Sequence, residues 1–69
     1  MRLSARNVLK GTVKSIEVGA VNDEVVIEVA PGCEITSIIT KKSAETLGLK
    51  VGGEAYAVIK ASAVMLGAD

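Results

Sequence analysis

Val and Ile residues occur in short clusters along the chain, and polar residues separate them at short intervals. The clearest case is residues 24–29, where an extended backbone places two Glu side chains on one face and three β-branched side chains on the other. Such residues suit the pleated surface of a strand. We therefore expect five strands, at Val8–Val18, Val21–Ala30, Glu34–Thr40, Ala55–Lys60 and Val64–Gly67.

Glycine, proline and short polar runs mark the breaks in this pattern. Pro31-Gly32 is the strongest turn signal in the chain. Gly11 predicts a bend or bulge, and the apolar pattern changes phase between Val13 and Ile16. Residues 41–48 lack strand character and end at a glycine, so we expect one or two helical turns there.

The order of these elements predicts an all-β fold. Five short strands with one short helix between the third and fourth strands are typical of an OB-like five-stranded barrel. Closing the sheet removes the edge strands that otherwise invite aggregation. A dimer with a swapped-hairpin β-barrel fits the same order of elements. Sixty-nine residues are too few for a second core, so we expect residues 1–69 to form a single domain.

The small size of the chain also bears on how it stays folded. A domain of this length buries only about 60% of the surface that its unfolded chain exposes. The single cysteine, Cys33, cannot form an internal disulfide, and aromatic residues make up 1% of the sequence. We therefore expect an obligate homo-oligomer in a reducing compartment, the cytoplasm. No apolar run approaches the roughly 20 residues that cross a bilayer, so we expect no membrane insertion.

The residue types that are missing exclude several kinds of chemistry. The sequence has no His, which removes His-based acid–base catalysis, Ser-His or Cys-His nucleophile pairs and the usual His/Cys metal cages. Eight basic and eight acidic side chains give a formal net charge of zero, which is a poor match to a nucleic-acid-binding domain. We therefore expect neither an enzyme nor a metal ion ligated directly by side chains.

Two segments combine cationic, hydroxyl and amide donors without an acid. Ser4-Ala5-Arg6-Asn7 comes directly before the first strand, and Lys60-Ala61-Ser62 lies at the end of the fourth. Thr40 adds a hydroxyl at the end of the third strand. A deprotonated oxyanion has only acceptor oxygens, so such donor sets suit it. The turn Gly19-Ala20-Val21 can point backbone N–H groups outward and so form a second oxyanion site.

Each of these segments also fits a plainer structure. The first is typical of a solvated N-terminal arm, and the second of a strand that ends in an exposed lysine. Thr40 suits the N-cap of a helix, and residues 19–21 suit an ordinary hairpin turn. The donor pattern alone therefore leaves the choice open.

Taken together, the motifs resemble those of the molbindins, small molybdate-binding proteins built from a single TOBE-type domain. The likeness begins with Ser4-Ala5-Arg6-Asn7, Leu9-Lys10-Gly11 and Val13, and it ends with Val58-Ile59-Lys60-Ala61-Ser62 and Val64-Met65-Leu66. Between these segments it includes Val25-Val26-Ile27-Glu28, Ile35-Thr36-Ser37-Ile38-Ile39-Thr40, Ser43, Leu47-Gly48-Leu49 and Gly52. The resemblance therefore covers nearly the whole chain.

The resemblance implies an OB-like barrel that assembles into a homohexamer, a trimer of dimers, in the bacterial cytoplasm. It also implies that molybdate, and tungstate, binds between subunits for storage and buffering and not for catalysis. By position, the oxyanion-binding groups are those of Ser4, Ala5, Arg6, Asn7, Thr40, Lys60, Ala61 and Ser62, with a second site at Gly19, Ala20 and Val21. Within this set, Asn7 is expected to hold the loop.

Three rival interpretations remain, of which a single-strand nucleic-acid OB-fold is the weakest, because base stacking needs aromatic side chains and Tyr56 stands alone. The run Leu47-Gly48-Leu49-Lys50-Val51-Gly52 before a β-rich segment also resembles AbrB-like swapped-hairpin DNA-binding dimers. The neutral charge balance and the lack of a dense Arg/Lys patch count against DNA binding. A structural or interaction domain that binds no small ligand is the third alternative.

Overall fold

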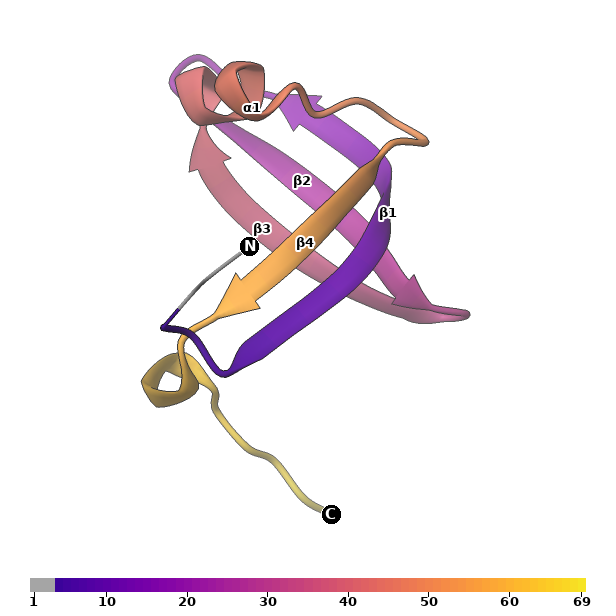
Figure 1. Cartoon of the computed structure of the whole chain (residues 1–69), viewed down its shortest axis with the longest axis vertical. Helices are drawn as coiled ribbons and strands as arrows, with labels where there is room; N and C mark the ends of the chain where they lie inside the picture. Colours follow the sequence, from indigo (N-terminus) through magenta and orange to yellow (C-terminus); the bar gives the residue numbers. More distant parts are fainter. Residues whose placement is uncertain (1–3) are drawn as a thin grey trace.

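The longest strand, β1, lies in the middle of a curled antiparallel sheet (Figure 1). The computed structural model describes residues 4–69. The strands follow the order β3-β2-β1-β4, and they are β1 (Asn7–Val18), β2 (Asn22–Ala30), β3 (Cys33–Thr40) and β4 (Glu54–Ile59). A helix, α1 (Lys41–Leu47), lies between β3 and β4, and a 3₁₀ turn, η1 (Ala61–Ala63), follows β4. The first four expected strands and the helix are confirmed to within one residue at each end.

β1 has a different partner along each half of its length, which explains why the sheet curls. Residues 7–12 pair with β4, and residues 12–18 pair with β2. The register with β2 shifts between Val13 and Ser15, which confirms the change of apolar phase expected there. This bulge increases the local twist of β1 at the point where it leaves one partner for the other.

Gly11 lies at this crossover, but the bulge expected at Gly11 is wrong in position, because Gly11 keeps a regular register with Ala55. A Cβ atom at residue 11 would lie 2.6 Å from the Glu28 carbonyl oxygen. Glycine therefore permits a close approach of two backbones rather than a bend.

Inward-facing side chains of β1 and β2 form a small core. Val13, Val25 and Ile27 are the buried centre, and the partly buried residues packed around them are Ile16, Val29, Ile35, Ile39, Leu49, Ala55 and Ala57. The alternation along β2 is as expected, since Val25 and Ile27 are buried and Glu24 is exposed. Many large apolar side chains stay exposed, among them Val18, Val21, Ile38, Leu47, Val51, Met65 and Leu66. A core this small is consistent with the predicted need for self-association.

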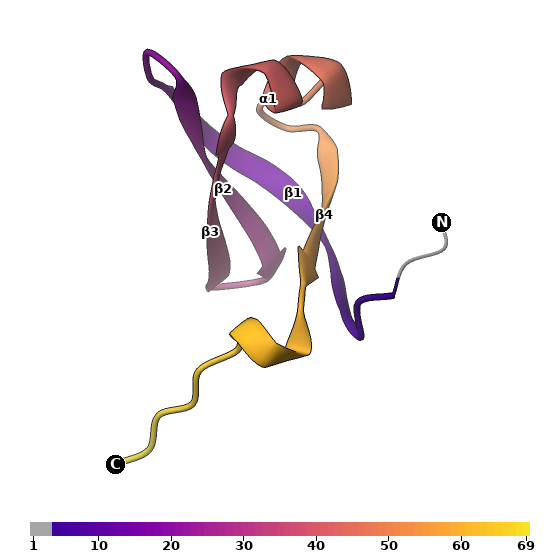
Figure 2. The ribbon, with the colours of Figure 1, turned by 90° about the vertical axis from the view of Figure 1, so that its left-hand side faces the viewer.

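The helix begins and ends as its sequence predicts. The Thr40 hydroxyl caps α1 by accepting a hydrogen bond from the Ser43 N–H at 3.0 Å. Gly48 ends the helix in the left-handed conformation, with φ at 67°. The Lys41 N–H donates to the Val21 carbonyl at 2.9 Å, so α1 lies beside the β1–β2 turn (Figure 2). Among residues 4–69, no helix has the length and apolar character needed to span a membrane.

The fifth strand expected at Val64–Gly67 is wrong for this protomer. After β4, two backbone hydrogen bonds within η1, to the carbonyls of Lys60 (2.8 Å) and Ala61 (3.3 Å), turn the chain away from the sheet. Residues 64–69 then leave the sheet without regular structure, as Figures 1 and 2 show. A strand needs an adjacent edge for its backbone hydrogen bonds, and this segment has none. The described fold is therefore mostly β with one short helix and four strands, not a closed five-stranded barrel.

Candidate functional site

The start of β1 and the end of β4 bring two of the predicted donor segments together. Asn7 lies opposite Ile59, and its side-chain Nδ2 donates to the Ile59 carbonyl at 3.3 Å. This bond holds the preceding loop beside residues 60–62. The two segments border an open hollow of about 600 Å³, lined by Ser4, Ala5, Arg6, Val58, Lys60, Ala61 and Ser62. Asn7 holds the loop and is not among the lining residues.

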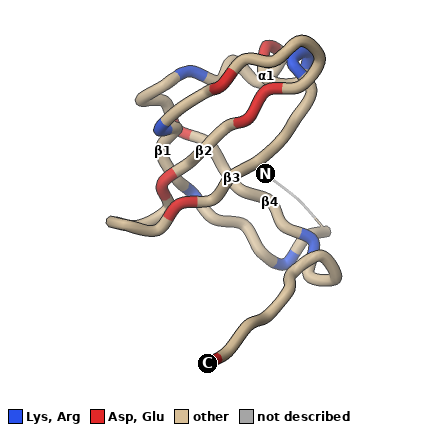
Figure 3. The backbone as a smooth tube through the Cα atoms, turned by 180° about the vertical axis from the view of Figure 1, so that it is seen from behind, with Lys and Arg blue, Asp and Glu red and all other residues tan. Residues whose placement is uncertain are grey.

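The hollow carries positive charge and no carboxylate. Its charged side chains are those of Arg6 and Lys60, and two serines add hydroxyl groups. Within residues 4–69, neither of the two cations forms an ion pair. Figure 3 shows the same separation along the backbone, since the acidic positions lie away from this end of the sheet except at the tip of the chain. The arrangement suits an anion that accepts hydrogen bonds at every oxygen.

The lysines of β1 differ from the cations of the hollow because each has an acidic partner. The Lys10 Nζ lies 3.3 Å from a Glu54 carboxylate oxygen. The Lys14 Nζ lies 3.2 Å from a carboxylate oxygen of both Glu28 and Glu34. Hydrogen bonds from Lys14 to these two carboxylates raise its pKa above the ordinary value of 10.5. The charge of both lysines is therefore compensated locally.

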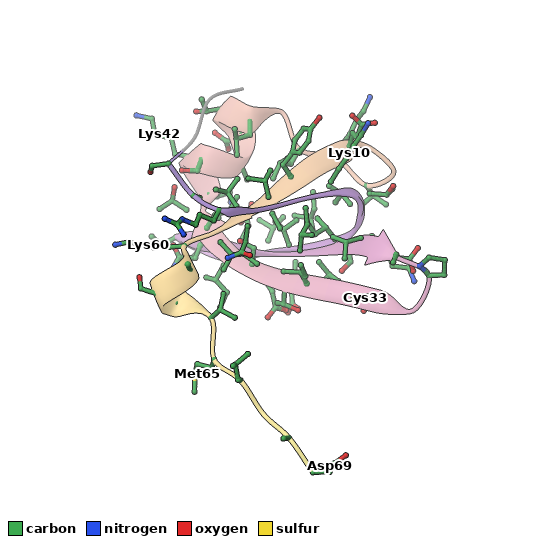
Figure 4. All side chains as sticks on the ribbon, turned by 60° about the horizontal axis from the view of Figure 1, so that its bottom comes forward. Lys10, Cys33, Lys42, Lys60, Met65 and Asp69 are labelled. Carbon is green, nitrogen blue, oxygen red and sulfur yellow. The ribbon has the colours of Figure 1, made fainter. Side chains whose placement is uncertain are left out.

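The polar groups of the hollow remain open to solvent in one protomer. Ser4, Arg6, Lys60 and Ser62 are all exposed, and only Ala5 is half-buried. Figure 4 shows Lys60 at the base of η1, pointing outward from the sheet. Electrostatic attraction is weak when water surrounds the charges. The donor groups of the hollow are therefore surrounded by water on one side in a single protomer.

Thr40 lies at the opposite end of the sheet, where β3 runs into α1 (Figure 1). Its register partner is Asn22, at the start of β2. It borders a separate hollow of about 400 Å³, lined by Thr40, Lys42, Ser43, Thr46 and Leu47. The structure therefore does not bring Thr40 together with Arg6 and Lys60 within one protomer.

The hydroxyl of Thr40 is already engaged by its neighbour. It donates to the Ser43 Oγ at 2.7 Å and accepts from the Ser43 N–H at 3.0 Å. The hydroxyl proton that this pair can offer to a ligand is therefore that of Ser43. Sequence reasoning did not single out Ser43 as a donor, although its spacing of three residues from an N-cap threonine signals the contact.

An acid, Asp23, lies in β2 directly beyond the β1–β2 turn. Asp23 is 5% exposed, and its Oδ1 accepts a hydrogen bond from the Gly19 N–H at 3.3 Å. Gly19, Ala20 and Val21 are exposed, but an anion bound there would lie close to this carboxylate and be repelled by it. The turn is thus a poorer anion site than the hollow at the other end. The sequence already contains this information, because Asp23 stands two positions after the turn.

Val58 is the one lining residue of the larger hollow that the sequence did not suggest. It lies two positions before Lys60, so the period of a strand predicts that the two side chains share a face. Elsewhere, the part of the chain that the structure describes has no group of three or more His, Cys, Asp or Glu residues that could hold a metal ion. The donors at this end of the sheet are of the kinds that suit an anion.

A known family model and a curated relative match this chain along nearly its whole length. The TOBE domain model matches residues 3–66. Molybdenum-pterin-binding protein 1 of Clostridium pasteurianum is 52% identical over 66 residues, which cover 96% of this chain and 97% of that protein. The matched region includes both segments that border the larger hollow.

Two solved structures share the fold. MopII from Clostridium pasteurianum aligns with a TM-score of 0.90 and 51% identity, over 97% of this chain and 100% of that one. The cytoplasmic molybdate-binding protein ModG, in a form with molybdate bound, aligns with a TM-score of 0.94 and 59% identity, over 100% of this chain and 49% of that one. The resemblance to the molbindins drawn from the sequence is confirmed, and the chain belongs to the TOBE domain family.

Proposed function

We propose that this protein binds molybdate as an intact oxyanion between protomers, and that it stores and buffers the anion without catalysis. The observation that carries the proposal is the hollow in which Arg6 and Lys60 lie with hydroxyl and backbone donors and no carboxylate. Family membership supports it, because a relative of nearly equal length is named for molybdenum-pterin binding and a solved relative holds molybdate.

The chemistry of the donors favours molybdate over phosphate. Molybdate at neutral pH is a tetrahedral dianion whose four oxygens only accept hydrogen bonds, so a pocket made of donors satisfies it completely. Monohydrogen phosphate would present its O–H to another donor, and each unmatched buried polar group costs about 1–3 kcal/mol. Tungstate has the same charge, shape and lack of protons, so we include it as a second ligand. Sulfate also matches in charge, and the size of the closed cavity must discriminate against it.

Two features support a site completed by a neighbouring protomer. The donors of the hollow are exposed on one side in a single protomer, and burial would strengthen their bonds to a dianion. The predicted donor Thr40 and its partner Ser43 lie at the far end of the same sheet. These two residues can therefore reach the hollow only from another copy of the chain. We accordingly propose a homohexamer, a trimer of dimers, in which residues 1–69 act as one binding module.

The proposed location is the cytoplasm. The solved relative that holds molybdate is described as a cytoplasmic protein, and the exposed thiol of Cys33 suits a reducing compartment.

The DNA-binding alternative finds no support. The relatives named above are described by molybdenum-pterin or molybdate binding. The two lysines of β1 that could contact phosphates are each paired with an acid, Lys10 with Glu54 and Lys14 with Glu28 and Glu34. A surface compensated in this way attracts a polyanion weakly.

Isothermal titration with molybdate tests the proposal by comparing two alanine variants, one at Arg6 and one at Lys10. Arg6→Ala removes an uncompensated charge from the hollow, whereas Lys10→Ala removes a charge that Glu54 compensates. Loss of a charge-assisted hydrogen bond costs about 1.5–3 kcal/mol, so we expect Arg6→Ala to raise the dissociation constant roughly 10- to 100-fold. Lys10→Ala should leave it within about threefold of the unchanged protein.

Sulfate and phosphate, titrated under the same conditions, serve as ligand controls and should bind at least an order of magnitude more weakly than molybdate. Equal losses for Arg6→Ala and Lys10→Ala would place the anion elsewhere. Absence of any molybdate binding by the unchanged protein would reject the function itself.

A further inference from the structure

Among residues 4–69, Val58 is the one branched apolar side chain that lines the hollow bordered by Arg6 and Lys60. The other lining residues are two serines, two alanines and the two cations. A threonine at this position would suit both a strand and an anion, because threonine favours strands and carries a hydroxyl. Val58 donates nothing, so any effect that it has on an anion comes from its apolar character.

β4 places this side chain on the face of the sheet that points away from the core. Ala55 and Ala57 alternate with Val58 along the strand and pack against the core, so Val58 faces the other way and is 44% exposed. Its register partner in β1 is Val8. Directly opposed residues of two strands have their side chains in contact on one face. Val58 is therefore supported from the side by a second valine.

Val58 is also the one lining residue that belongs to a strand. Residues 4–6 precede β1, Lys60 follows β4, and Ala61 and Ser62 lie in η1. A β-branched side chain in a strand has few rotamers, and groups on strands are held more precisely than groups on loops. The donors can adjust to an anion, whereas the apolar wall formed by Val58 stays in place.

A fixed apolar wall acts differently on anions of equal charge and different size. An anion that enters the hollow loses water, and an oxygen that faces Val58 receives no hydrogen bond in return. The cost of taking an ion out of water rises as its radius falls, because the same charge is concentrated in a smaller volume. Sulfate and molybdate are both tetrahedral dianions, and sulfate is the smaller. The wall therefore costs sulfate more free energy than molybdate.

We propose that Val58 is a specificity-determining residue of the oxyanion site, and that its apolar wall selects molybdate against sulfate. This inference rests on the proposed function and adds the residue that distinguishes the two dianions. The donors of the hollow, Arg6 and Lys60 among them, suit both anions, because each anion carries two negative charges and only acceptor oxygens. The smaller size of sulfate acts through its stronger hydration, at the side of the hollow that offers no hydrogen bond.

Isothermal titration of the full chain with molybdate and with sulfate tests this role in Val58→Thr. Threonine keeps the branched shape and offers a hydroxyl to the oxygen that faces residue 58. A hydrogen bond to a charged group strengthens binding about tenfold or more, so we expect sulfate to bind roughly tenfold more tightly than to the unchanged protein. Molybdate loses less at the wall and should gain less than about threefold. An unchanged ratio of the two dissociation constants overturns the proposal.

Two matched variants separate the hydroxyl from other effects of substitution. Val8→Thr makes the same change at the register partner, which does not line the hollow, and should keep the ratio of the unchanged protein. Val58→Ala removes two methyl groups but leaves the wall apolar, and should keep the ratio within about twofold. If either variant lowers the ratio as much as Val58→Thr does, stability or cavity volume determines the selectivity, and the proposal is wrong.

A series of anions on the unchanged protein gives a test that does not depend on the folding of any variant. Selenate is a tetrahedral dianion of intermediate size, so we expect affinity to rise from sulfate through selenate to molybdate. Selenate that binds no more tightly than sulfate contradicts selection by hydration. Absence of molybdate binding by the unchanged protein rejects the proposed function as well. Tight molybdate binding with the same ratio in Val58→Thr rejects only the role of Val58, so the two failures are distinguishable.

Discussion

The carboxylate of Asp23 distinguishes the two candidate anion sites at the level of single residues. It is 5% exposed and accepts one hydrogen bond, from the Gly19 N–H at 3.3 Å. The hollow around Arg6 and Lys60 has no acid among its lining residues. A carboxylate repels a dianion that is bound close to it. We therefore expect the hollow to accept a dianion more readily than the turn does.

Replacement of this acid should add anion binding at the β1–β2 turn. Asp23→Asn keeps an oxygen for the Gly19 N–H and removes the negative charge, so we expect more molybdate ions bound per protomer than in the unchanged protein. Glu24→Gln removes the same charge from the exposed neighbouring position and should not change the number. Equilibrium dialysis with molybdenum analysis measures both. Equal stoichiometry in all three proteins would mean that the turn is only a hairpin connection.

At the level of elements, α1 depends on the residues at its two ends. A helix of seven residues is too short to be stable alone. Thr40 caps its first turn, and Gly48 ends its last with φ at 67°. The contact from the Lys41 N–H to the Val21 carbonyl then fastens it to the β1–β2 turn. The caps hold in place the hydroxyl of Ser43, which accepts a hydrogen bond from Thr40 and keeps its own proton for a ligand.

Loss of the N-cap should therefore lower stability measurably. Thr40→Ala removes the acceptor for the Ser43 N–H, and the loss of such a cap costs about 1 kcal/mol, or roughly 4–8 °C in the thermal midpoint of a domain of this size. Thr40→Ser keeps the hydroxyl and should retain most of the midpoint, and Thr46→Ala, within the helix, should not lower it. Differential scanning calorimetry gives the comparison. A midpoint unchanged in Thr40→Ala would show that the cap contributes little.

The elements that could be predicted from the sequence are those whose ends are determined by residues close to them in the chain. The turn at Pro31-Gly32, the cap at Thr40 and the stop at Gly48 each act over a few positions, and their strands and helix are confirmed within one residue. The strand at Val64–Gly67 could not be predicted in the same way, because a strand exists only where another strand offers its edge. The role of Gly11 depends likewise on the distant Glu28 carbonyl.

At the level of the whole molecule, the protomer buries little and exposes much. Its buried apolar residues within 4–69 are Val13, Val25, Ile27 and Ala44. The polar side chains of the candidate site are likewise exposed in a single protomer. Sequence reasoning identified the donors around Arg6 and Lys60 because their types and their lack of acids are visible in the sequence. It could not show that Thr40 lies at the far end, since that depends on how β1 shares its length between two partners.

Molybdate should stabilise the assembled protein by ordinary linkage. Arg6 and Lys60 both border the hollow, and a dianion bound there would offset both charges in the folded protein. At a free molybdate concentration 100 times the dissociation constant, the gain is about 2.7 kcal/mol, so we expect the thermal midpoint to rise by on the order of 10 °C. The same concentration of sulfate is the control for ionic strength. A midpoint that molybdate does not move would contradict a folded-state site.

The three residues of η1 and the lysine before them connect two exposed parts of the protomer. Lys60, Ala61 and Ser62 border the hollow, and residues 64–69, which follow the turn, carry Met65 and Leu66 at 92% and 94% exposure. An anion held by Lys60 and Ser62 would therefore also restrict the direction in which this apolar segment leaves the sheet.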